Sequence, residues 1–101
     1  MDFKLLSVEQ LQYASEMLKA MAHPLRIELL NLLQSRGELS VSQIQNELKI
    51  DQAVTSHHLL ILKNRAILGS RREGKNILYF VKNENLGDIL HCLNNCACKH
   101  S

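Results

Sequence analysis

The repeat of apolar residues changes once along the chain from a helical to a strand-like period, and this change limits the folds that the chain can adopt. Up to residue 66, apolar residues recur every three or four positions in four successive segments. Residues 67–72 and 76–81 have the composition of two strands around the turn Glu73-Gly74-Lys75. A last helical stripe follows through Leu86, Ile89, Leu90 and Leu93. We therefore expect a mostly α fold with a small β-hairpin (α+β), ordered as four helices, a hairpin and a closing helix.

Residues that commonly begin or end helices mark the boundaries of these segments. Ser7 and Ser40 are each followed three positions later by glutamine, which is the spacing of a capping box. Asp51 is a suitable N-cap for the fourth helix. Pro24 suits the first turn of the second helix, and Gly37 suits its end. These signals predict helix starts at residues 8, 24, 41 and 52.

The third and fourth helices are joined by the brief turn at residues 49–51, so residues 41–66 are a helix-turn-helix candidate. A hairpin directly after such a pair, here at about residues 67–82, takes the place of a wing. The closing helix is expected at about residues 84–98. The 101-residue chain has no internal repeat or linker, so we expect residues 1–101 to form a single winged-helix domain. A domain this small would gain buried surface from a partner subunit.

Composition and motifs exclude several classes of protein. Apolar runs are too short to span a bilayer, and the first residues lack the pattern of a secretory signal. The three cysteines lie within the last ten residues, unlike a disulfide framework. A glycine-rich phosphate loop, a nucleophile elbow and a metalloprotease histidine pair are all absent from the sequence. We therefore expect a cytoplasmic protein that is neither membrane-bound nor an enzyme.

Positive charge is concentrated in one third of the chain. Residues 1–51 carry five Lys/Arg against seven Asp/Glu, for a net charge of −2. Residues 52–82 carry six against Glu73 alone, for +5, and residues 83–101 carry one against two, for −1. A basic block of this kind indicates contact with a polyanion. The alternative is a solvated basic face with no partner.

The fourth helix has two chemically different faces at about 100° per residue. His58 lies at the edge of the inward face, so we interpret it as a structural residue rather than a ligand. His57 points outward about 100° away, and the two rings are therefore not arranged to hold one ion. The inward face comprises Thr55, Leu59, Leu62 and Ala66. The outward face comprises Ala53, Ser56, His57 and Leu60, flanked by Gln52 and Lys63.

The outward face suits a DNA groove. A major groove admits an α-helix, and glutamine, serine and histidine side chains can form hydrogen bonds to base edges. Basic side chains nearby suit phosphate contacts, which position a protein without specifying a sequence. The predicted phosphate contacts are Lys63, Arg65, Arg71, Arg72 and Lys75. RNA is a weaker alternative, because the hairpin lacks the aromatic surface that stacks on single strands.

Three segments between roughly residues 15 and 82 resemble, in this order, bacterial ArsR/SmtB-type winged helix-turn-helix repressors. They are MLKAMAHPLRIELL, LSVSQIQNELKIDQAVTSHHLLILKNRAIL and SRREGKNILYFV. The resemblance implies a homodimer through the first and last helices, bound to double-stranded operator DNA and released by an inducer. It places Gln52, Ala53, Val54, Ser56 and His57 on the base-reading positions. The expected dimer contacts are Leu11, Leu18, Leu86, Ile89, Leu90 and Leu93. The alternative function is a winged-helix protein-interaction module without inducer sensing.

Two metal sites of that family are not reproduced. Ser40-Val41-Ser42 stands where the arsenic-sensing branch has Cys-x-Cys, and hydroxyl groups are poor ligands for soft metals. Asp88 and His91 are one residue too far apart for the zinc-sensing pattern.

The C-terminal tail holds the remaining candidates for an inducer site. Cys92 and Cys96 are an i,i+4 pair, and His100 continues their line about 12 Å from Cys92 along an intact helix. Cys98 points to the opposite side. Binding of a soft metal or metalloid such as zinc or arsenite is one interpretation, and redox sensing is another. The third is packing at a dimer interface, because free cysteine behaves as a small hydrophobe.

Overall fold

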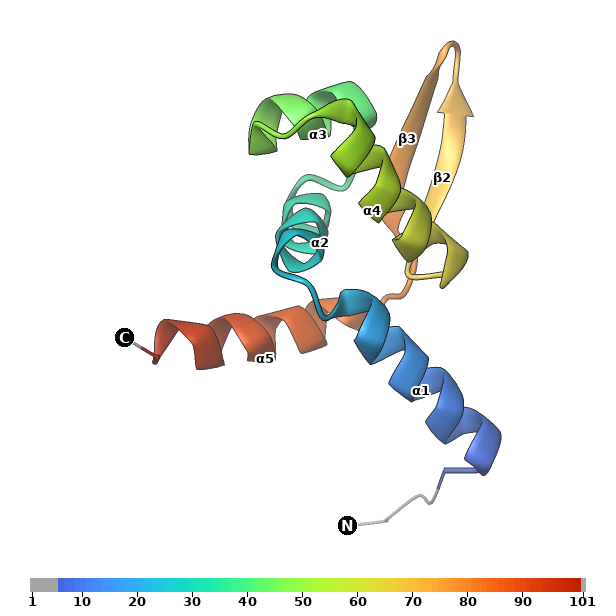
Figure 1. The fold of residues 1–101 in the computed structure, drawn as a ribbon, viewed down its shortest axis with the longest axis vertical. Coiled ribbons are helices and arrows are strands. Elements are labelled where there is room, and N and C mark those ends of the chain that lie inside the picture. Colours follow the sequence, from blue (N-terminus) through green and yellow to red (C-terminus); the bar gives the residue numbers. More distant parts are fainter. Residues whose placement is uncertain (1–5, 101) are drawn as a thin grey trace.

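The computed structural model describes residues 6–100, which form a group of helices with a small antiparallel sheet whose hairpin projects at one side, in a winged-helix arrangement (Figure 1). The predicted α+β class and the order of the helices are confirmed. One short strand is added before the third helix. The elements are α1 (Val8–Met21), α2 (Pro24–Arg36), β1 (Glu38–Ser40), α3 (Val41–Leu48), α4 (Gln52–Asn64), β2 (Leu68–Glu73), β3 (Asn76–Val81) and α5 (Leu86–Cys98).

The added strand β1 makes the predicted two-stranded hairpin a three-stranded sheet in the order β1-β3-β2. Leu39 pairs with Tyr79 in an antiparallel register, and its side chain is buried in the core. The sequence prediction missed β1 because three residues are too short to show a period of two, and the strand that pairs with them is distant in the sequence. This strand ties the base of the wing to the helix-turn-helix.

The predicted helix starts are confirmed by hydrogen bonds from the capping side chains. Both capping boxes are complete: Ser7 accepts from the Gln10 amide at 3.1 Å, and Ser40 accepts from the Gln43 amide at 3.2 Å. Asp51 accepts from the backbone amide of Val54 at 2.9 Å. These local contacts satisfy amide groups that the first turn of a helix leaves without partners.

The end of α4 differs from the prediction, which placed Ala66 on the inward face. The helix ends at Asn64, and Ala66 is exposed with a left-handed φ of 60°. The Ile67 amide donates to the Leu62 carbonyl and the Ala66 amide to the Lys63 carbonyl, both at 3.0 Å. This is the Schellman arrangement, in which the left-handed residue turns the chain away from the helix axis. The turn leads the chain into β2 and the wing.

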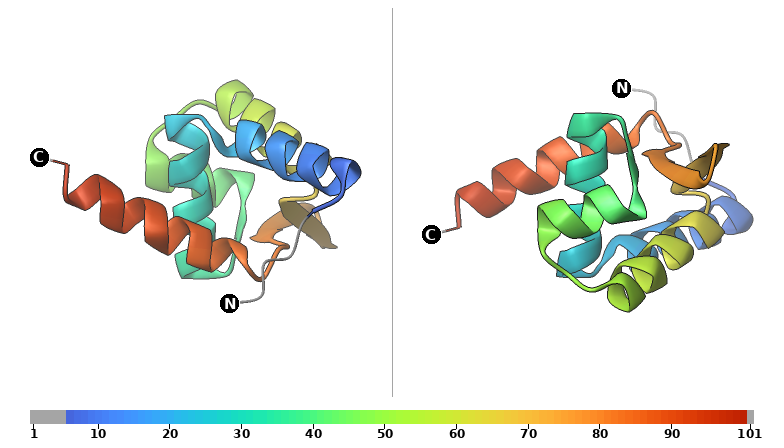
Figure 2. Two further views of the ribbon diagram at one scale, coloured as in Figure 1. Left: turned by 90° about the horizontal axis from the view of Figure 1, so that it is seen from below. Right: turned by 90° about the horizontal axis from the view of Figure 1, so that it is seen from above.

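The core is aliphatic and lies between the helices and the inner face of the sheet. All of the helices contribute to it, as do the strands β1 and β2. Its fully buried members are Leu29, Leu30, Leu33, Ile44, Leu59, Leu62, Ile67, Leu68, Leu86 and Leu90. Both views in Figure 2 show the C-terminal part of α5 extending away from the other elements. The core therefore fixes α4 and the base of the wing but leaves the end of α5 uncovered.

Candidate nucleic-acid interface

The two faces of α4 are separated as predicted. Thr55, Leu59 and Leu62 are fully buried, and the Thr55 hydroxyl donates to the Asp51 carbonyl at 2.8 Å. The inward face is therefore apolar apart from one satisfied hydroxyl and one imidazole. Every residue predicted to read bases is exposed: Gln52, Ala53, Val54, Ser56 and His57. The structure thus presents these five side chains on one helix supported from behind.

The turn between α3 and α4 sets the angle between these two helices. Lys49 caps the end of α3 with a left-handed φ of 56°, and its amide donates to the Gln45 carbonyl at 2.8 Å. Ile44 is fully buried on the inward face of α3. A tight left-handed turn between two short helices is the geometry that a helix-turn-helix requires.

His58 is buried, at 7% exposed, as its position on the helix predicts. Its Nδ1 accepts a hydrogen bond from the Nε of Arg26 on α2 at 3.1 Å. The centres of the His23 and His57 rings lie 4.6 Å and 5.3 Å from the centre of its ring. Burial lowers the pKa of His58, and the neighbouring His23, Arg26 and His57 lower it further. Sequence reasoning missed Arg26, because no local signal links α2 to α4.

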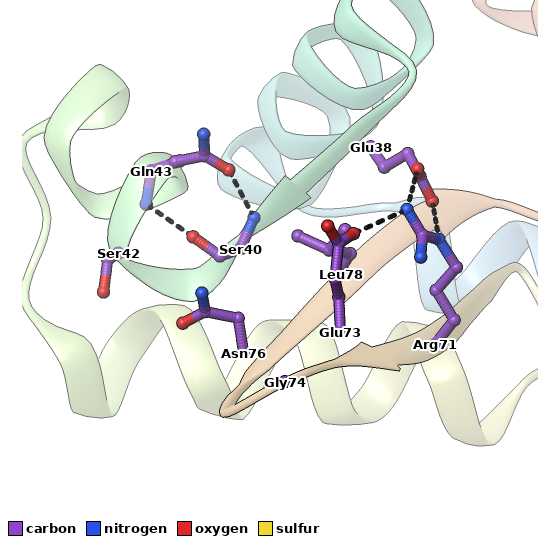
Figure 3. A pocket seen from close by; sticks show the side chains of 9 residues that line it. All are labelled: Glu38, Ser40, Ser42, Gln43, Arg71, Glu73, Gly74, Asn76 and Leu78. Atoms are coloured by element: carbon purple, nitrogen blue, oxygen red, sulfur yellow. Dashed lines mark hydrogen bonds and ion pairs between the residues drawn. The ribbon is translucent and has the colours of Figure 1, made fainter.

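Arg71 is held by two carboxylates (Figure 3). Its Nε and an Nη donate to Glu38 at 2.7 Å and 2.6 Å, and the same Nη donates to Glu73 at 2.9 Å. Hydrogen bonding from Arg71 lowers the pKa of Glu38, and the pairing raises the pKa of Arg71. Two carboxylates therefore engage Arg71, which links β2 to β1 across the sheet. Its contact with phosphate stays a prediction.

The other predicted phosphate contacts differ in how far they are engaged. Arg65 pairs with Glu16 of α1 at 3.1 Å and thereby ties the end of α4 to α1. Lys63, Arg72 and Lys75 are exposed, and no carboxylate of residues 6–100 forms an ion pair with them. Of the predicted phosphate contacts on the wing, Arg72 and Lys75 are therefore available to a polyanion.

The predicted dimer contacts divide into two groups. Leu86 and Leu90 are 0% and 2% exposed inside this subunit, so their assignment to a dimer interface is wrong. They form the part of the α5 stripe that packs on the core, and a fully buried side chain has no surface left for a partner. Leu11, Leu18 and Leu93 are exposed, and Ile89 is half-buried. These four remain candidates for the contact between subunits.

The C-terminal cysteines do not form a metal site within one subunit. Cys92, Cys96 and Cys98 are exposed free thiols, and His100 is exposed beyond the end of α5. Across residues 6–100, no three His, Cys, Asp or Glu side chains are grouped to hold an ion. Cys92 and Cys96 border a shallow apolar hollow with Asp88, Ile89 and Leu93. A structural zinc ion takes four ligands, so these residues alone do not fit one.

The helices described by the structure include none that is both long and apolar enough to cross a membrane.

Comparisons with known proteins agree with this architecture. The sequence profile described as "Bacterial regulatory protein, arsR family" matches residues 23–67. An HTH-type transcriptional regulator of Methanocaldococcus jannaschii is 36% identical over 83 residues, which cover 82% of this chain and 93% of the relative. The transcriptional repressor PagR of Bacillus anthracis is 36% identical over 80 residues, covering 79% of this chain and 80% of the relative.

Solved structures give the same result. The crystal structure of PagR superposes with a TM-score of 0.81 at 33% identity, covering 86% of this chain and 99% of PagR. The AntR antimony-specific transcriptional repressor superposes with a TM-score of 0.82 at 25% identity, covering 99% of this chain and 89% of AntR. These relatives are transcriptional regulators rather than enzymes. The chain belongs to the ArsR family of bacterial regulatory proteins and is a DNA-binding transcriptional regulator of the winged-helix type.

Proposed function

We propose that this chain represses transcription as a homodimer on operator DNA, with α4 of each subunit in a major groove. The observation that carries the proposal is the exposed face of α4, fixed from behind by a buried face, beside a wing on which Arg72 and Lys75 are exposed and form no ion pair within residues 6–100. A major groove admits one helix, and the wing beside that helix can contact the phosphates that flank the groove. Such a role would place the protein in the cytoplasm with the DNA.

The two kinds of contact fall on different side chains. Gln52, Ser56 and His57 carry groups that form hydrogen bonds to base edges, and Ala53 and Val54 can contact a thymine methyl. Phosphate contacts are assigned to Lys63, Arg72 and Lys75. Arg65 and Arg71 are assigned to bracing, because Glu16, Glu38 and Glu73 already pair with them.

Fluorescence anisotropy on two duplexes tests this division. One duplex comes from upstream of the protein's own gene, and the other has the same bases in shuffled order. We expect the wild type to prefer the first duplex. His57→Ala and Gln52→Ala should reduce that preference, whereas Lys75→Ala should weaken binding to both duplexes alike. Equal losses on both duplexes for all three variants would contradict the assignment.

A protein-interaction module is the second candidate function. Protein interface cores are depleted in charge, whereas the segment that contains α4 and the wing carries a net charge of +5. That difference favours DNA. Absence of any preference between the two duplexes, with a folded wild-type protein, would favour the interaction module.

The homodimer is supported by the surface of the two terminal helices. Leu11 and Leu18 of α1 and Leu93 of α5 expose large apolar side chains, and Ile89 is half-buried beside Leu93 on α5. Apolar groups of this size favour removal from water. A dimer would also strengthen DNA binding, because two linked reading helices bind a duplex far more tightly than one.

We assign any inducer response to Cys92 and Cys96, which lie one helical turn apart on the exposed end of α5. Thiolates are ligands for soft metals and metalloids and are also targets of oxidants. The antimony-specific relative AntR supports the choice of a metalloid probe. Because residues 6–100 of one subunit bring no third His, Cys, Asp or Glu side chain to this pair, we propose that a second copy supplies the remaining ligands.

Titration of arsenite and then zinc into the preformed DNA complex tests this assignment. Release of the wild type at stoichiometric ligand, lost in the Cys92→Ser/Cys96→Ser double variant, would support it. Cys98→Ser is the matched control and should behave as the wild type. A double variant that still responds fully would rule out these thiols. A DNA complex that neither arsenite nor zinc releases would direct the search to thiol oxidation.

A further inference from the structure

The half-buried guanidinium of Arg26 connects three helices, including the one that carries the proposed reading face. From α2, its Nε donates to His58 of α4 at 3.1 Å. Its Nη1 donates to the carbonyl of Ala20, in the last turn of α1, at 3.0 Å. Arg26 therefore joins the end of α1 to the buried side of α4. On α4, His58 lies between the exposed His57 and the buried Leu59. The position of its ring therefore sets how α4 is rotated about its own axis.

The contact between Arg26 and His58 depends on the protonation state of the imidazole. A guanidinium has donors but no acceptor, so the Nδ1 of His58 must carry a lone pair. The proton of the neutral ring is then on Nε2. His23 is constrained in the same way, because its Nδ1 accepts from the Leu25 amide at 3.1 Å and caps α2. Protonation of Nδ1 on either ring removes one acceptor from this cluster.

None of the groups that shift the pKa of His58 would stabilise a charged ring. Burial lowers its pKa most, followed by His23, Arg26 and His57, none of which is acidic. Three carboxylates on the elements that pack against α4 have other partners, whereas Glu9 of α1 and Glu28 of α2 form no ion pair among residues 6–100. Glu16 of α1 pairs with Arg65, Glu47 of α3 with Arg36, and Glu73 of β2 with Arg71. Asp51, at the start of α4, caps the helix.

We infer that Arg26 and His58 are positioning residues for DNA reading: the hydrogen bond from Arg26 to neutral His58 holds α4 in the orientation that discriminates among sequences. Neither residue touches DNA in this account, because both side chains lie behind the reading face. The inference rests on the proposed function and adds a regulatory consequence to it. Acidification that protonates His58 breaks the contact, places two cations side by side and weakens sequence-specific binding.

His58→Asn separates this role from simple packing. The Oδ1 of asparagine lies near the place of Nδ1 and can accept from Arg26, but the amide does not titrate. We would measure Kd for wild type and His58→Asn on the promoter duplex and on the shuffled duplex, from pH 7.5 to 5.5 at fixed ionic strength. The two proteins should agree within a few-fold at pH 7.5.

The pKa of His58 is lowered from the ordinary histidine pKa of about 6.5, so the ratio of wild-type to variant Kd on promoter DNA should rise only below that pH. One proton permits a rise of up to about tenfold per pH unit. On shuffled DNA the ratio should stay near one, because binding there depends on charge rather than on the orientation of α4.

Circular dichroism at each pH confirms that both proteins are folded where binding is compared. If His58→Asn does not fold, Arg26→Met gives the second test. It should lose promoter preference at pH 7.5, and its Kd should show less dependence on pH than that of the wild type. Identical pH profiles for folded wild type and folded variant would overturn the positioning role while leaving the DNA-binding function intact. A folded wild type with no promoter preference at pH 7.5 would overturn both.

Discussion

The helices α4 and α5 each have 13 residues, but the subunit supports them very differently. Side-chain contacts hold α4 along its whole length: Asp51 caps its start, Arg26 binds its centre and Glu16 pairs with Arg65 at its end. In α5, the N-terminal half packs into the core through Leu86 and Leu90. Every residue from 91 to 100 is exposed. One subunit is therefore enough to hold α4 in place, whereas the end of α5 is open to a contact outside the subunit. We call α4 and the wing, the proposed DNA contacts, the reading half.

The largest expected effect comes from a charge placed on the uncovered end of α5. Leu93→Glu should separate the dimer, because the carboxylate would have to lose its water in the interface. Loss of the linked second reading helix should weaken promoter binding by about 100-fold or more. Sedimentation velocity measures the dissociation, and anisotropy measures the binding.

Leu60→Glu is the matched control for the oligomeric state. Leu60 is 57% exposed on α4, and Leu93 is 42% exposed on α5, so both substitutions put a charge on similarly open surfaces. Only Leu93→Glu should change the sedimentation coefficient. Dissociation by both variants, or by neither, would remove the distinction between the two helices.

Substitutions on the wing should have a smaller effect on DNA binding, and Arg72 and Arg71 should differ in this effect. Arg72→Ala should weaken binding to any duplex by about tenfold, the loss of one charged phosphate contact. It should also reduce the slope of log K against log salt by about one. A salt series of anisotropy titrations measures both quantities.

Glu38→Gln tests the brace on the neighbouring arginine. If Arg71 serves only to hold β2 on β1, removal of the Glu38 charge should not strengthen DNA binding. If Glu38 instead withholds Arg71 from phosphate, the variant should bind more tightly, with a salt slope increased by about one. The second outcome would return Arg71 to the phosphate contacts.

The support of α4 should also make stability depend on pH. The pKa of His58 is lowered in the folded state, so the unfolded chain binds more protons just below pH 6.5. The contribution of neutral His58 to the free energy of unfolding is therefore complete at pH values above the pKa of histidine in the unfolded chain. This contribution is lost as the pH falls through the lower pKa of His58 in the folded protein. Urea unfolding of wild type and His58→Asn at several pH values measures the difference, and parallel curves would show that His58 does not contribute.

The smallest expected effect lies at the end of α4. Ala66 adopts a left-handed conformation that glycine enters without steric cost. Ala66→Gly should therefore raise the free energy of unfolding by roughly 0.5–1 kcal/mol and the melting temperature by a few degrees. The substitution touches no proposed DNA contact, so promoter affinity should stay unchanged. A lower melting temperature would contradict this interpretation of the turn.

Features that depend on neighbours in the sequence were predictable. Capping boxes, the proline and glycine at the ends of α2, and the change of period at the wing are all signals within a few residues. The separation of the two faces of α4 follows from helical geometry alone. The resemblance of three segments to a known family was enough to propose the candidate reading residues.

Features that depend on distant partners were not predictable. Nothing near Arg71 indicates that Glu38 will lie beside it, because β1 and β2 meet only through the sheet. The contact of Arg26 with His58 joins residues 32 positions apart. The apolar stripe of α5 was visible in the sequence, but which part of it the same subunit covers was not. For that reason Leu86 and Leu90 were assigned to the wrong contact.

Sedimentation velocity of the protein with a labelled promoter duplex tests the central claim most directly. We expect complexes of two chains per duplex for the wild type, even when DNA is in excess. Leu93→Glu should form no specific complex at the same concentration. A one-chain complex of the wild type that still distinguishes promoter from shuffled DNA would show that the reading half acts without a partner, and it would contradict the proposed homodimer.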